Sequence, residues 1–523
     1  MEVKNMGLRL IKKGKKGLLS VIFSRFWIMA ILIVLQFVAL FAGIFWFAEY
    51  RMQYDTVKNI FVAIMVLYLL NHNMNSTAKI TWLVLVMLFP VFGSLLFWFV
   101  ELEIGHRVEK ARLSYLVDFT KNSIQQDKEV LQKLSQESPE TESLVHYLAH
   151  SGCFPIYDKT AVTYYPSGET KFEELLKQLE KAKKFIFLEY FIIEEGIMWG
   201  RVLEILAKKA AEGVEVRVMY DGTCESSLLP FDYPKRLEAL GIKCKMFAPV
   251  TPFLSTHYNY RDHRKIVVID GQVAFTGGVN LADEYINQKL RFGHWKDTAI
   301  MVRGEAVKSF TLMFLQMWNL EEKNPDFYKY INVPVAPIEE ANGYVVPYGD
   351  CPLDDDKTGE RVYMDILNRA NKYVHIMTPY LILDGEMETA LRFAAKRGVD
   401  VKIILPAIPD KKSAFALAKS HYKHLLEAGV KIYEYTPGFV HAKVFTSDDC
   451  KAVVGTINLD YRSLYHHYEC AAYMYQTDCI ADIERDFEET LEKCARVTKE
   501  TIKKEKLGVK LAGWVFKVVA PLM

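Results

Sequence analysis

The side chains best suited to chemistry in this sequence lie in a short segment that begins at His263. His263 is followed by Lys265 and, after an unbroken apolar run, by Asp270, a pattern typical of a strand buried on both faces. Residues two apart on a strand project to the same face, so we expect His263 and Lys265 to lie side by side. A buried imidazole and a buried ammonium group are costly without partners, so this pair is expected to bind an anion or neighbouring polar groups.

A second copy of this pattern lies near the C-terminal end of the chain. His441, Lys443 and Asp448 repeat the spacing of the first copy. Each histidine is also followed, after the same interval, by an asparagine, which is Asn280 in the first copy and Asn458 in the second. Four matching residue types at matching intervals are difficult to obtain by chance. The sequence therefore indicates an internal duplication in which each half contributes one motif to a shared site.

Two imidazoles that face one pocket suit a two-step displacement at phosphorus. One imidazole attacks the phosphorus and forms a covalent phosphohistidine, while the other protonates the leaving alcohol and then deprotonates the incoming one. Four further side chains are expected to bind the non-bridging oxygens and to offset the charge of the transition state: Lys265, Lys443, Asn280 and Asn458. Because the protein itself supplies this positive charge, we expect no metal ion and no other cofactor.

The attacking imidazole also needs its second ring nitrogen held by a partner, which is often a carboxylate. Asp297 follows His263 in the first half, where Glu284 is an alternative, and Glu469 follows His441 in the second half. These three carboxylates are the candidates for orienting the histidines.

The aspartates of the two motifs, Asp270 and Asp448, are counted with the catalytic set because they complete the repeated pattern. Each of them ends its strand, however, so an architectural role is also open to them. We therefore expect neither aspartate to transfer a proton.

The residues around the two motifs show the pattern of an α/β fold, in which predicted strands alternate with predicted helices. The apolar segment 184–193 predicts a buried strand, and the helical spacing of apolar residues in 199–212, closed by Gly213, predicts a helix after it. The second half repeats this order with a strand at 372–380 and a helix at 387–397. Strands that alternate with helices of this length predict a mostly parallel or mixed sheet covered by helices. We therefore predict two duplicated α-β-α halves that face each other.

Changes in composition divide the chain into several regions. A charged, periodic segment at 106–150 predicts a helical connector, and the two α/β halves are expected at 151–335 and 340–500, separated by loop-forming residues. The tail at 501–523 combines apolar residues, a tryptophan and lysines. This pattern is typical of an interfacial helix lying on a membrane, and a helix docked on the second half explains it equally well.

Residues 1–105 are expected to form an N-terminal membrane anchor. Apolar runs at 27–48 and 80–100 are each long enough to cross a bilayer as a helix, and a shorter run at 57–72 is a further candidate span. The first run is too long for the core of a signal peptide, and the positive-inside rule places residues 1–26 in the cytoplasm. These features predict a multi-pass integral membrane protein. With two spans, the residues after the anchor would lie in the cytoplasm, and with three spans they would lie outside it.

The bulk composition disfavours several other classes of protein. A formal net charge of +1 gives no basis for a general affinity for nucleic acids. Eight cysteines are scattered without a CxxC pair or a spacing typical of zinc ligands, so neither a metal site nor a redox compartment is indicated. No feature of the sequence specifies an oligomeric state.

The duplicated motifs and their surroundings resemble the phospholipase D superfamily and, within it, the bacterial cardiolipin synthases. The segments that carry the resemblance are 261–271, 275–280, 283–285, 294–298, 439–443 and 458–463. The resemblance implies phosphatidyl transfer between two phosphatidylglycerol molecules in a bacterial cell membrane, giving cardiolipin and glycerol without a metal. By the habit of the superfamily, His263 would be the attacking histidine. One departure is His467, at a position where relatives often carry asparagine.

Three alternatives to a synthase are also compatible with the motifs. A hydrolytic phospholipase D would use the same residues with water as the acceptor, and a membrane-tethered phosphodiesterase or nuclease would act on another ester. A non-enzymatic membrane scaffold would keep the fold without needing both His-Lys pairs. The near-zero net charge and the long apolar runs disfavour the nuclease, and the two intact motifs disfavour the scaffold.

Overall fold

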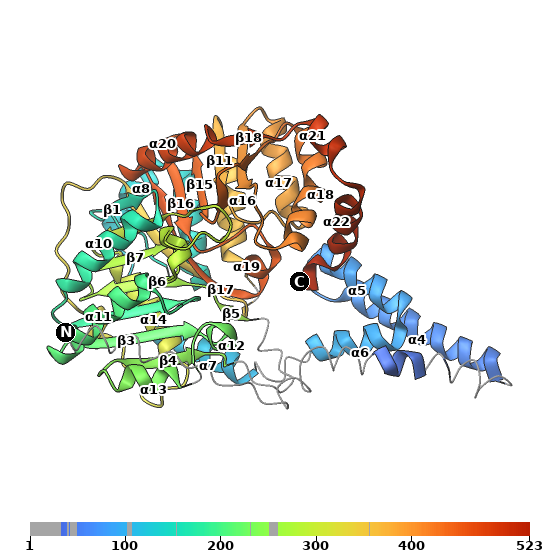
Figure 1. Cartoon of the computed structure of the whole chain (residues 1–523), viewed down its shortest axis with the longest axis horizontal. Helices are drawn as coiled ribbons and strands as arrows, with labels where there is room; N and C mark the ends of the chain where they lie inside the picture. The colour runs from blue at the N-terminus through green and yellow to red at the C-terminus, as the bar shows by residue number, and fades with distance from the viewer. Residues whose placement is uncertain are drawn as a thin grey trace.

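Two β-sheets with their covering helices make up the body of the molecule, and an arm of apolar helices extends from it (Figure 1). The structure is a computed structural model that describes residues 33–38, 41, 50–101, 107–152, 154–230, 232–249, 260–354 and 356–522. Each half of the chain forms one sheet, and both sheets mix parallel and antiparallel strands. The predicted α/β class with two duplicated halves is confirmed.

The first sheet has seven strands in the order β1-β9-β7-β6-β2-β3-β4. These strands are β1 (Ala161–Tyr165), β9 (Ala299–Arg303), β7 (Val273–Gly277), β6 (Lys265–Ile269), β2 (Phe185–Tyr190), β3 (Glu215–Asp221) and β4 (Lys243–Phe247). The three strands β2, β3 and β4 are parallel, and the remaining pairings are antiparallel. Every residue of β2 and β6 is buried, which explains why these strands are mostly apolar.

The second sheet repeats this arrangement in the order β10-β17-β16-β15-β11-β12-β13-β18. These strands are β10 (Tyr344–Asp350), β17 (His467–Tyr475), β16 (Lys451–Gly455), β15 (Val444–Ser447), β11 (Tyr373–Met377), β12 (Asp400–Pro406), β13 (Lys431–Tyr435) and β18 (Cys494–Arg496). As in the first sheet, three consecutive strands are parallel, here β11, β12 and β13, and the strand that follows a His-Lys pair lies antiparallel beside the first of them.

Amphipathic helices cover the outer faces of the sheets and fill the space between them. The outer face of the first sheet packs against α10 (Gly168–Glu180) and α11 (Ile197–Ala211). The outer face of the second packs against α16 (Thr358–Arg369), α17 (Gly385–Lys396) and α18 (Lys412–Ala428). A third core between the sheets combines side chains of both halves with those of α14 (Val307–Trp318) and α20 (Cys479–Leu491). The two halves therefore share one continuous core. Shorter elements are α12 (Thr223–Ser227), α13 (Tyr233–Glu238), η5 (Asp283–Ile286), α15 (Tyr328–Ile331), α19 (Tyr461–Tyr465) and η6 (Ala520–Leu522).

Two short parallel pairings join the halves at the level of the sequence motifs. β5 (Arg261–Asp262) pairs with the start of β17, so a strand of the first half adds to the second sheet. β14 (Gly438–Val440) pairs in the same way with β8 (His294–Lys296), which belongs to the first half. Each of the strands β5 and β14 immediately precedes a His-Lys pair. Both motifs therefore lie on the boundary between the halves.

The segment before the first half forms three helices, α7 (Arg107–Thr120), α8 (Lys128–Glu137) and α9 (Pro139–Gly152). α7 contacts α14, whereas α9 contacts α16 and β10 of the second half. This segment is therefore packed against both halves and contributes to their cores.

The N-terminal arm consists of α4 (Arg51–Asn71), α5 (Ser76–Leu88) and α6 (Pro90–Glu101). In the described part of the chain, the segment Met52–Asn71 of α4 is the one helix long and apolar enough to cross a membrane. The shorter run predicted at 57–72 thus falls on the strongest candidate span. The run predicted at 27–48 lies mostly outside the described residues.

The prediction of one span at 80–100 is wrong, because two helices divide this run. α5 ends at Leu88, and Pro90 begins α6, since a proline lacks the N–H that would continue the first helix and suits the first turn of the next. α6 packs closely on α5, and a Cβ atom at Gly93 would lie 2.7 Å from the backbone of Leu85. Neither helix alone has the length of a span. The described residues do not support the predicted multi-pass topology.

The C-terminal tail forms α21 (Lys499–Lys504) and α22 (Leu507–Val519) and ends in η6. One face of α22 packs on α18, and its C-terminal end contacts α5 of the arm. The tail therefore touches both the second half and the N-terminal arm, which lie on the same side of the molecule in Figure 1.

Candidate active site

His263 is positioned by the pairing of β5 with β17. Asp262 lies opposite Tyr468 in this register, so the next residues along the two strands, His263 and Glu469, come to lie side by side. The backbone N–H of His263 donates to the carbonyl oxygen of Tyr468 at 2.9 Å. Its Nδ1–H donates to the two carboxylate oxygens of Glu469, at 2.8 and 3.0 Å. The hydroxyl of Thr456 donates to the same fully buried carboxylate and fixes it in place.

His441 is positioned by the equivalent pairing of β14 with β8. Val440 lies opposite Lys296, so His441 and Asp297 are the next residues along the two chains. The backbone N–H of His441 donates to the carbonyl oxygen of Lys296 at 2.7 Å. Its Nδ1–H donates to Oδ2 of Asp297 at 2.7 Å, while Oδ1 accepts the backbone N–H of Thr298 at 2.8 Å. Nδ1 is thus engaged in both histidines, which leaves Nε2 as the nitrogen that can react.

Each histidine is therefore oriented by a carboxylate of the opposite half. The order of residues along the chain led us to expect Asp297 as the partner of His263 and Glu469 as the partner of His441. The structure shows the opposite pairing, because β5 and β14 cross to the other half. Glu284, the alternative to Asp297, contacts neither histidine, and its Oε1 accepts a hydrogen bond from Arg291 at 3.2 Å. Neither half supplies the carboxylate that orients its own histidine. The two histidine–carboxylate pairs therefore form only where the halves meet.

Lys265 and Lys443 bring two ammonium groups into the same buried space. Lys265 Nζ donates to the carbonyl oxygen of His263 at 2.5 Å. Lys443 Nζ donates to the carbonyl oxygen of His441 and lies close to both nitrogens of that ring, 2.8 Å from Nδ1 and 3.1 Å from Nε2. Burial lowers the pKa of Lys265 to about 8 and that of Lys443 to about 7, because a charged ammonium group loses its hydration there. An anionic phosphate bound between them would favour the charged forms.

The electrostatics of the site keep both imidazoles neutral in the free protein. Burial holds the pKa values of His263 and His441 well below the ordinary value, and the charges of Lys265 and Lys443 act in the same direction. Burial also raises the pKa of Asp297 to about 7, against the opposing charge of Lys443. A neutral imidazole is the form that can attack phosphorus. A bound phosphodiester anion would raise the pKa of the second imidazole, which has to carry the proton.

The aspartates of the two motifs lie at the other ends of their strands, away from the histidines. Asp270 accepts three successive backbone N–H groups at 2.7–2.8 Å, from Lys183, Lys184 and Phe185. Asp448 accepts three equivalent groups at 2.7–2.9 Å, from Asn371, Lys372 and Tyr373. Both aspartates therefore hold the start of a central strand, β2 or β11. Their inclusion in the catalytic set is corrected to an architectural role.

The two asparagines occupy equivalent positions but differ in their contacts. Asn280 accepts the backbone N–H of Ile192 at 3.0 Å and donates to the hydroxyl of Tyr285 at 2.8 Å, so its amide is occupied by the protein. The Tyr285 ring in turn lies 5.3 Å from the ring of His441. Asn458 is 4% exposed, and its Oδ1 is buried without a hydrogen-bond partner. This oxygen can accept a hydrogen bond from a ligand hydroxyl, whereas a phosphate oxygen would need the Nδ2–H group of Asn458 as its donor.

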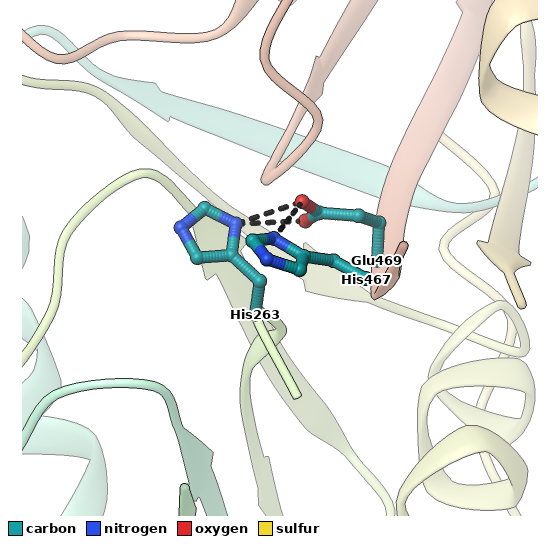
Figure 2. A group of neighbouring side chains, drawn as sticks. All are labelled: His263, His467 and Glu469. Atoms are coloured by element: carbon teal, nitrogen blue, oxygen red, sulfur yellow. Dashed lines mark hydrogen bonds and ion pairs between the residues drawn. The ribbon is translucent and has the colours of Figure 1, made fainter. Parts of the chain in front are cut away.

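A third histidine, His467, lies beside the first. Figure 2 shows that His263 and His467 both point toward Glu469. The two rings are 5.4 Å apart, and Nδ1 of His467 lies 3.7 Å from Oε1 of Glu469. Neither ring nitrogen of His467 has a hydrogen-bond partner, and burial lowers its pKa to about 3, so this ring stays neutral. Two features of the sequence point to this position: its place two residues before Glu469, and its departure from the asparagine of the resembling family.

These three side chains also form a donor set that could hold a metal ion, with their ligand atoms within 4.8 Å of one another. The charges of Lys265 and Lys443 act directly on His263. Two nearby ammonium groups repel a divalent cation and attract an anion. The electrostatics of the site therefore suit phosphate better than a metal.

Lys411 is a charged residue near the site that the sequence motifs do not indicate. It is the N-cap residue of α18, and its charge lowers the pKa values of both His263 and His441. Its Nζ lies 5.4 Å from the centre of the Tyr380 ring, whose hydroxyl donates to Asp410. Only the tertiary fold brings the start of α18 to this position, so no spacing along the chain predicts it.

Comparison with known families agrees with this geometry. A family described as "Cardiolipin synthase, PLD-like domain", in which PLD denotes phospholipase D, matches residues 175–318 and 363–491, one stretch in each half. A family described as "Phospholipase_D-nuclease N-terminal" matches residues 59–100, which form the arm. The crystal structure of phosphatidylserine synthase from Haemophilus influenzae shares the fold, with a TM-score of 0.57 at 15% sequence identity. That match covers 73% of this chain and 97% of the synthase.

Relatives of similar length extend the match over nearly the whole chain. A protein of Streptococcus mutans, described as uncharacterized, is 61% identical over 88% of this chain and 99% of its own length. The cardiolipin synthase of Alkalihalophilus pseudofirmus is 33% identical over 90% of this chain and 93% of its own length. That of Geobacillus kaustophilus is 33% identical over 92% and 95%. The chain therefore belongs to the bacterial cardiolipin synthase family of the phospholipase D superfamily.

Proposed function

We propose that this protein transfers a phosphatidyl group from one phosphatidylglycerol molecule to another, giving cardiolipin and glycerol. Family membership supports the broader part of this proposal, a phospholipid phosphatidyltransferase. The observation that carries the specific mechanism is the pair of neutral imidazoles, each fixed through Nδ1 by a carboxylate of the opposite half. The charges of Lys265 and Lys443 both act on each imidazole, so these four side chains lie close together.

In the first step, Nε2 of His263 attacks the phosphorus of the first phosphatidylglycerol. His441 takes up a proton on Nε2 when the phosphodiester anion binds, because the anion raises the pKa of the ring. A P–N bond forms, the P–O bond to the headgroup glycerol breaks, and the protonated His441 gives this proton to the departing oxygen. Free glycerol leaves, and the phosphatidyl group stays on His263. Lys265 and Lys443 neutralise the non-bridging oxygens, and the Nδ2–H group of Asn458 donates a hydrogen bond to one of them.

In the second step, a hydroxyl of the second phosphatidylglycerol gives its proton to His441 and attacks the same phosphorus. The P–N bond breaks, and His263 returns to its neutral form while cardiolipin is released. The two steps leave both histidines as they began. Glu469 and Asp297 stabilise each imidazole while it carries positive charge, as the carboxylate of a catalytic triad does.

We propose that the substrate reaches this site from the lipid phase of a bacterial cell membrane. Residues 1–105 would form the membrane anchor, with α4 as a crossing helix, and residues 151–335 and 340–500 would form the two catalytic halves. Polar contacts connect the start of α5 to the second half, since Asn75 donates to Asp384 at 2.7 Å and to Tyr465 at 3.0 Å. These contacts support an anchor that is held firmly to the catalytic body.

Product analysis tests the proposal. The purified full-length protein is supplied with phosphatidylglycerol alone, in mixed micelles, and lipids and glycerol are quantified over time. Cardiolipin and glycerol in equal amounts are expected, also in excess EDTA. Phosphatidic acid as the sole lipid product would establish a hydrolytic phospholipase D instead, and strict dependence on a metal ion would exclude the two-histidine mechanism.

The covalent intermediate has its own test. The substrate is a phosphatidyl ester of p-nitrophenol with the label in its diacylglycerol part, because this leaving group needs no proton from His441. With it, the His441→Ala protein is expected to retain label on His263 for longer than the wild type, because the acceptor is not deprotonated. His263→Ala should retain none. Transfer that persists in either variant at more than about 1% of the wild-type rate would overturn the assignment, since the loss of such a residue typically costs about 10⁴-fold or more.

A further inference from the structure

The C-terminal helix α22 exposes a continuous apolar stripe that nothing in the described chain covers. Its members repeat at helical spacing and are 43–69% exposed: Leu507, Leu511, Trp514, Val515 and Val518. The opposite face is tightly docked, because a Cβ atom at Gly513 would lie 2.5 Å from the carbonyl oxygen of Ala416 on α18. α22 is therefore a fixed part of the body that presents one apolar face outward.

We infer that this stripe lies in the surface of an anionic lipid bilayer, as an interfacial helix beside the N-terminal anchor. The first support for this occupant is charge. Lys503 and Lys504 end α21, and Lys506 is the N-cap of α22. All three are exposed, and lysines at the rim of an apolar stripe are attracted by anionic lipid headgroups. Trp514, in the middle of the stripe, is of the type that prefers the membrane–water interface.

The second support is continuity with the candidate membrane segments. The hydroxyl of Thr81 on α5 donates to the carbonyl oxygen of Val518 at 2.6 Å, so the arm and α22 are joined directly. α5 exposes Ile80, Met87 and Leu88 to a similar extent as the stripe. α22, α5 and α4 lie on one side of the molecule in Figure 1. A bilayer that receives α4 would therefore pass close to α22.

This placement would bring the site to the lipid surface. Ala520, just after α22, packs in a small core with Ile382, Ala414 and Tyr461. Tyr461 begins α19, three residues after Asn458, and Ala414 lies in the first turn of α18 near Lys411. If α22 lies in the headgroup layer, the start of α18 and α19 would therefore lie next to that layer. The inference rests on the proposed function only in that the substrate is a lipid.

Photocrosslinking of the full-length protein tests the occupant. Benzoylphenylalanine replaces Val515, which is 64% exposed, and in a matched control it replaces Ile197, which is 54% exposed. Ile197 belongs to α11, a helix that lies at the opposite end of the body from α22 in Figure 1. Both proteins carry His263→Ala, so that transfer does not change the lipids, and are placed in nanodiscs of phosphatidylglycerol and phosphatidylcholine. We expect lipid adducts at position 515 to exceed those at position 197 by about fivefold or more.

Equal lipid yields at the two positions would overturn the inference. A covalent dimer of the chain from position 515 would overturn it in favour of a second copy as the occupant. The triple variant Lys503→Gln, Lys504→Gln, Lys506→Gln tests the charge component. It should lower the lipid yield at position 515 about threefold in anionic nanodiscs and leave it unchanged in pure phosphatidylcholine, and an unchanged yield in both would remove the preference for anionic lipid. Because the proteins are catalytically inactive by design, these outcomes do not depend on the proposed reaction.

Discussion

In the proposed reaction, the charge of single lysines sets the pH range in which the site binds a phosphodiester. Burial gives Lys443 a pKa of about 7 and Lys265 a pKa of about 8, whereas the ordinary value is 10.5. A lysine with a lowered pKa loses its proton at a lower pH than usual. The free site is therefore most cationic below pH 7 and becomes progressively neutral above it, while both imidazoles are already neutral.

We expect kcat/KM for phosphatidylglycerol to fall as the pH rises from about 7 to about 9, because kcat/KM reports the ionisation of the free enzyme. Lys443→Arg should keep its charge throughout this range, since a guanidinium group stays protonated. Its alkaline limb is expected at least about one pH unit higher, whatever its absolute rate. The measurement is the pH profile of both proteins in the same micelles, and a limb in the arginine variant that coincides with that of the wild type would contradict the role of Lys443.

Sequence spacing predicted the candidate catalytic residues but not the side chains that they contact. His263, Lys265, His441 and Lys443 are recognisable because the pattern occurs twice. The exchange of Asp297 and Glu469 between halves depends on how β5 and β14 cross to the opposite half, and no interval along the chain contains that information. The burial that shifts each pKa is likewise a property of the assembled halves.

At the scale of elements, the site depends on how closely short segments approach at the boundary. A Cβ atom added at Gly278, just after β7, would lie 2.0 Å from Oδ1 of Asp297 and 2.8 Å from the carbonyl oxygen of His441. The first distance is far inside normal contact. The absence of a side chain at this position is therefore what allows the histidine of one half and the carboxylate of the other to meet.

Gly278→Ala is expected to lower kcat by roughly 10- to 100-fold, because a displacement of about 1 Å in a catalytic group has an effect of this size. Gly200→Ala is a matched control on α11, where an added Cβ meets nothing within 4 Å and the helix gains in propensity. Steady-state transfer rates are measured together with thermal unfolding. A Gly278→Ala protein with full activity would show that Asp297 need not hold its place beside His441.

The strands and helices of the two halves could be predicted because their apolar periodicity is strong and their order repeats. The membrane segments were predicted less well, because counting apolar residues ignores backbone chemistry. The run at 80–100 is long enough to span a bilayer, but Pro90 divides it into α5 and α6. The more polar α4 has the length that the divided run lacks.

At the scale of the whole molecule, the two halves are held together by buried polar contacts as well as by their shared core. Lys296 Nζ lies 2.7 Å from both carboxylate oxygens of Asp486 on α20, and the Tyr164 hydroxyl donates to the same carboxylate at 2.6 Å. Lys296 comes from β8 and immediately precedes Asp297, so this ion pair fixes the strand that orients His441. Its side chains are 7% and 10% exposed.

Lys296→Met is expected to lower the Tm of the full-length protein by roughly 3–5 °C, because removing one partner of a buried pair leaves an uncompensated charge and costs about 3–5 kcal/mol. The double variant Lys296→Met, Asp486→Leu should recover at least half of that loss, since apolar side chains can replace a buried pair. The control is Lys308→Met, which removes the partner of the exposed Glu305 and should change Tm by little. Thermal unfolding of the four proteins in one detergent measures these effects. If Lys296→Met matched Lys308→Met, the boundary between the halves would depend on the apolar core alone.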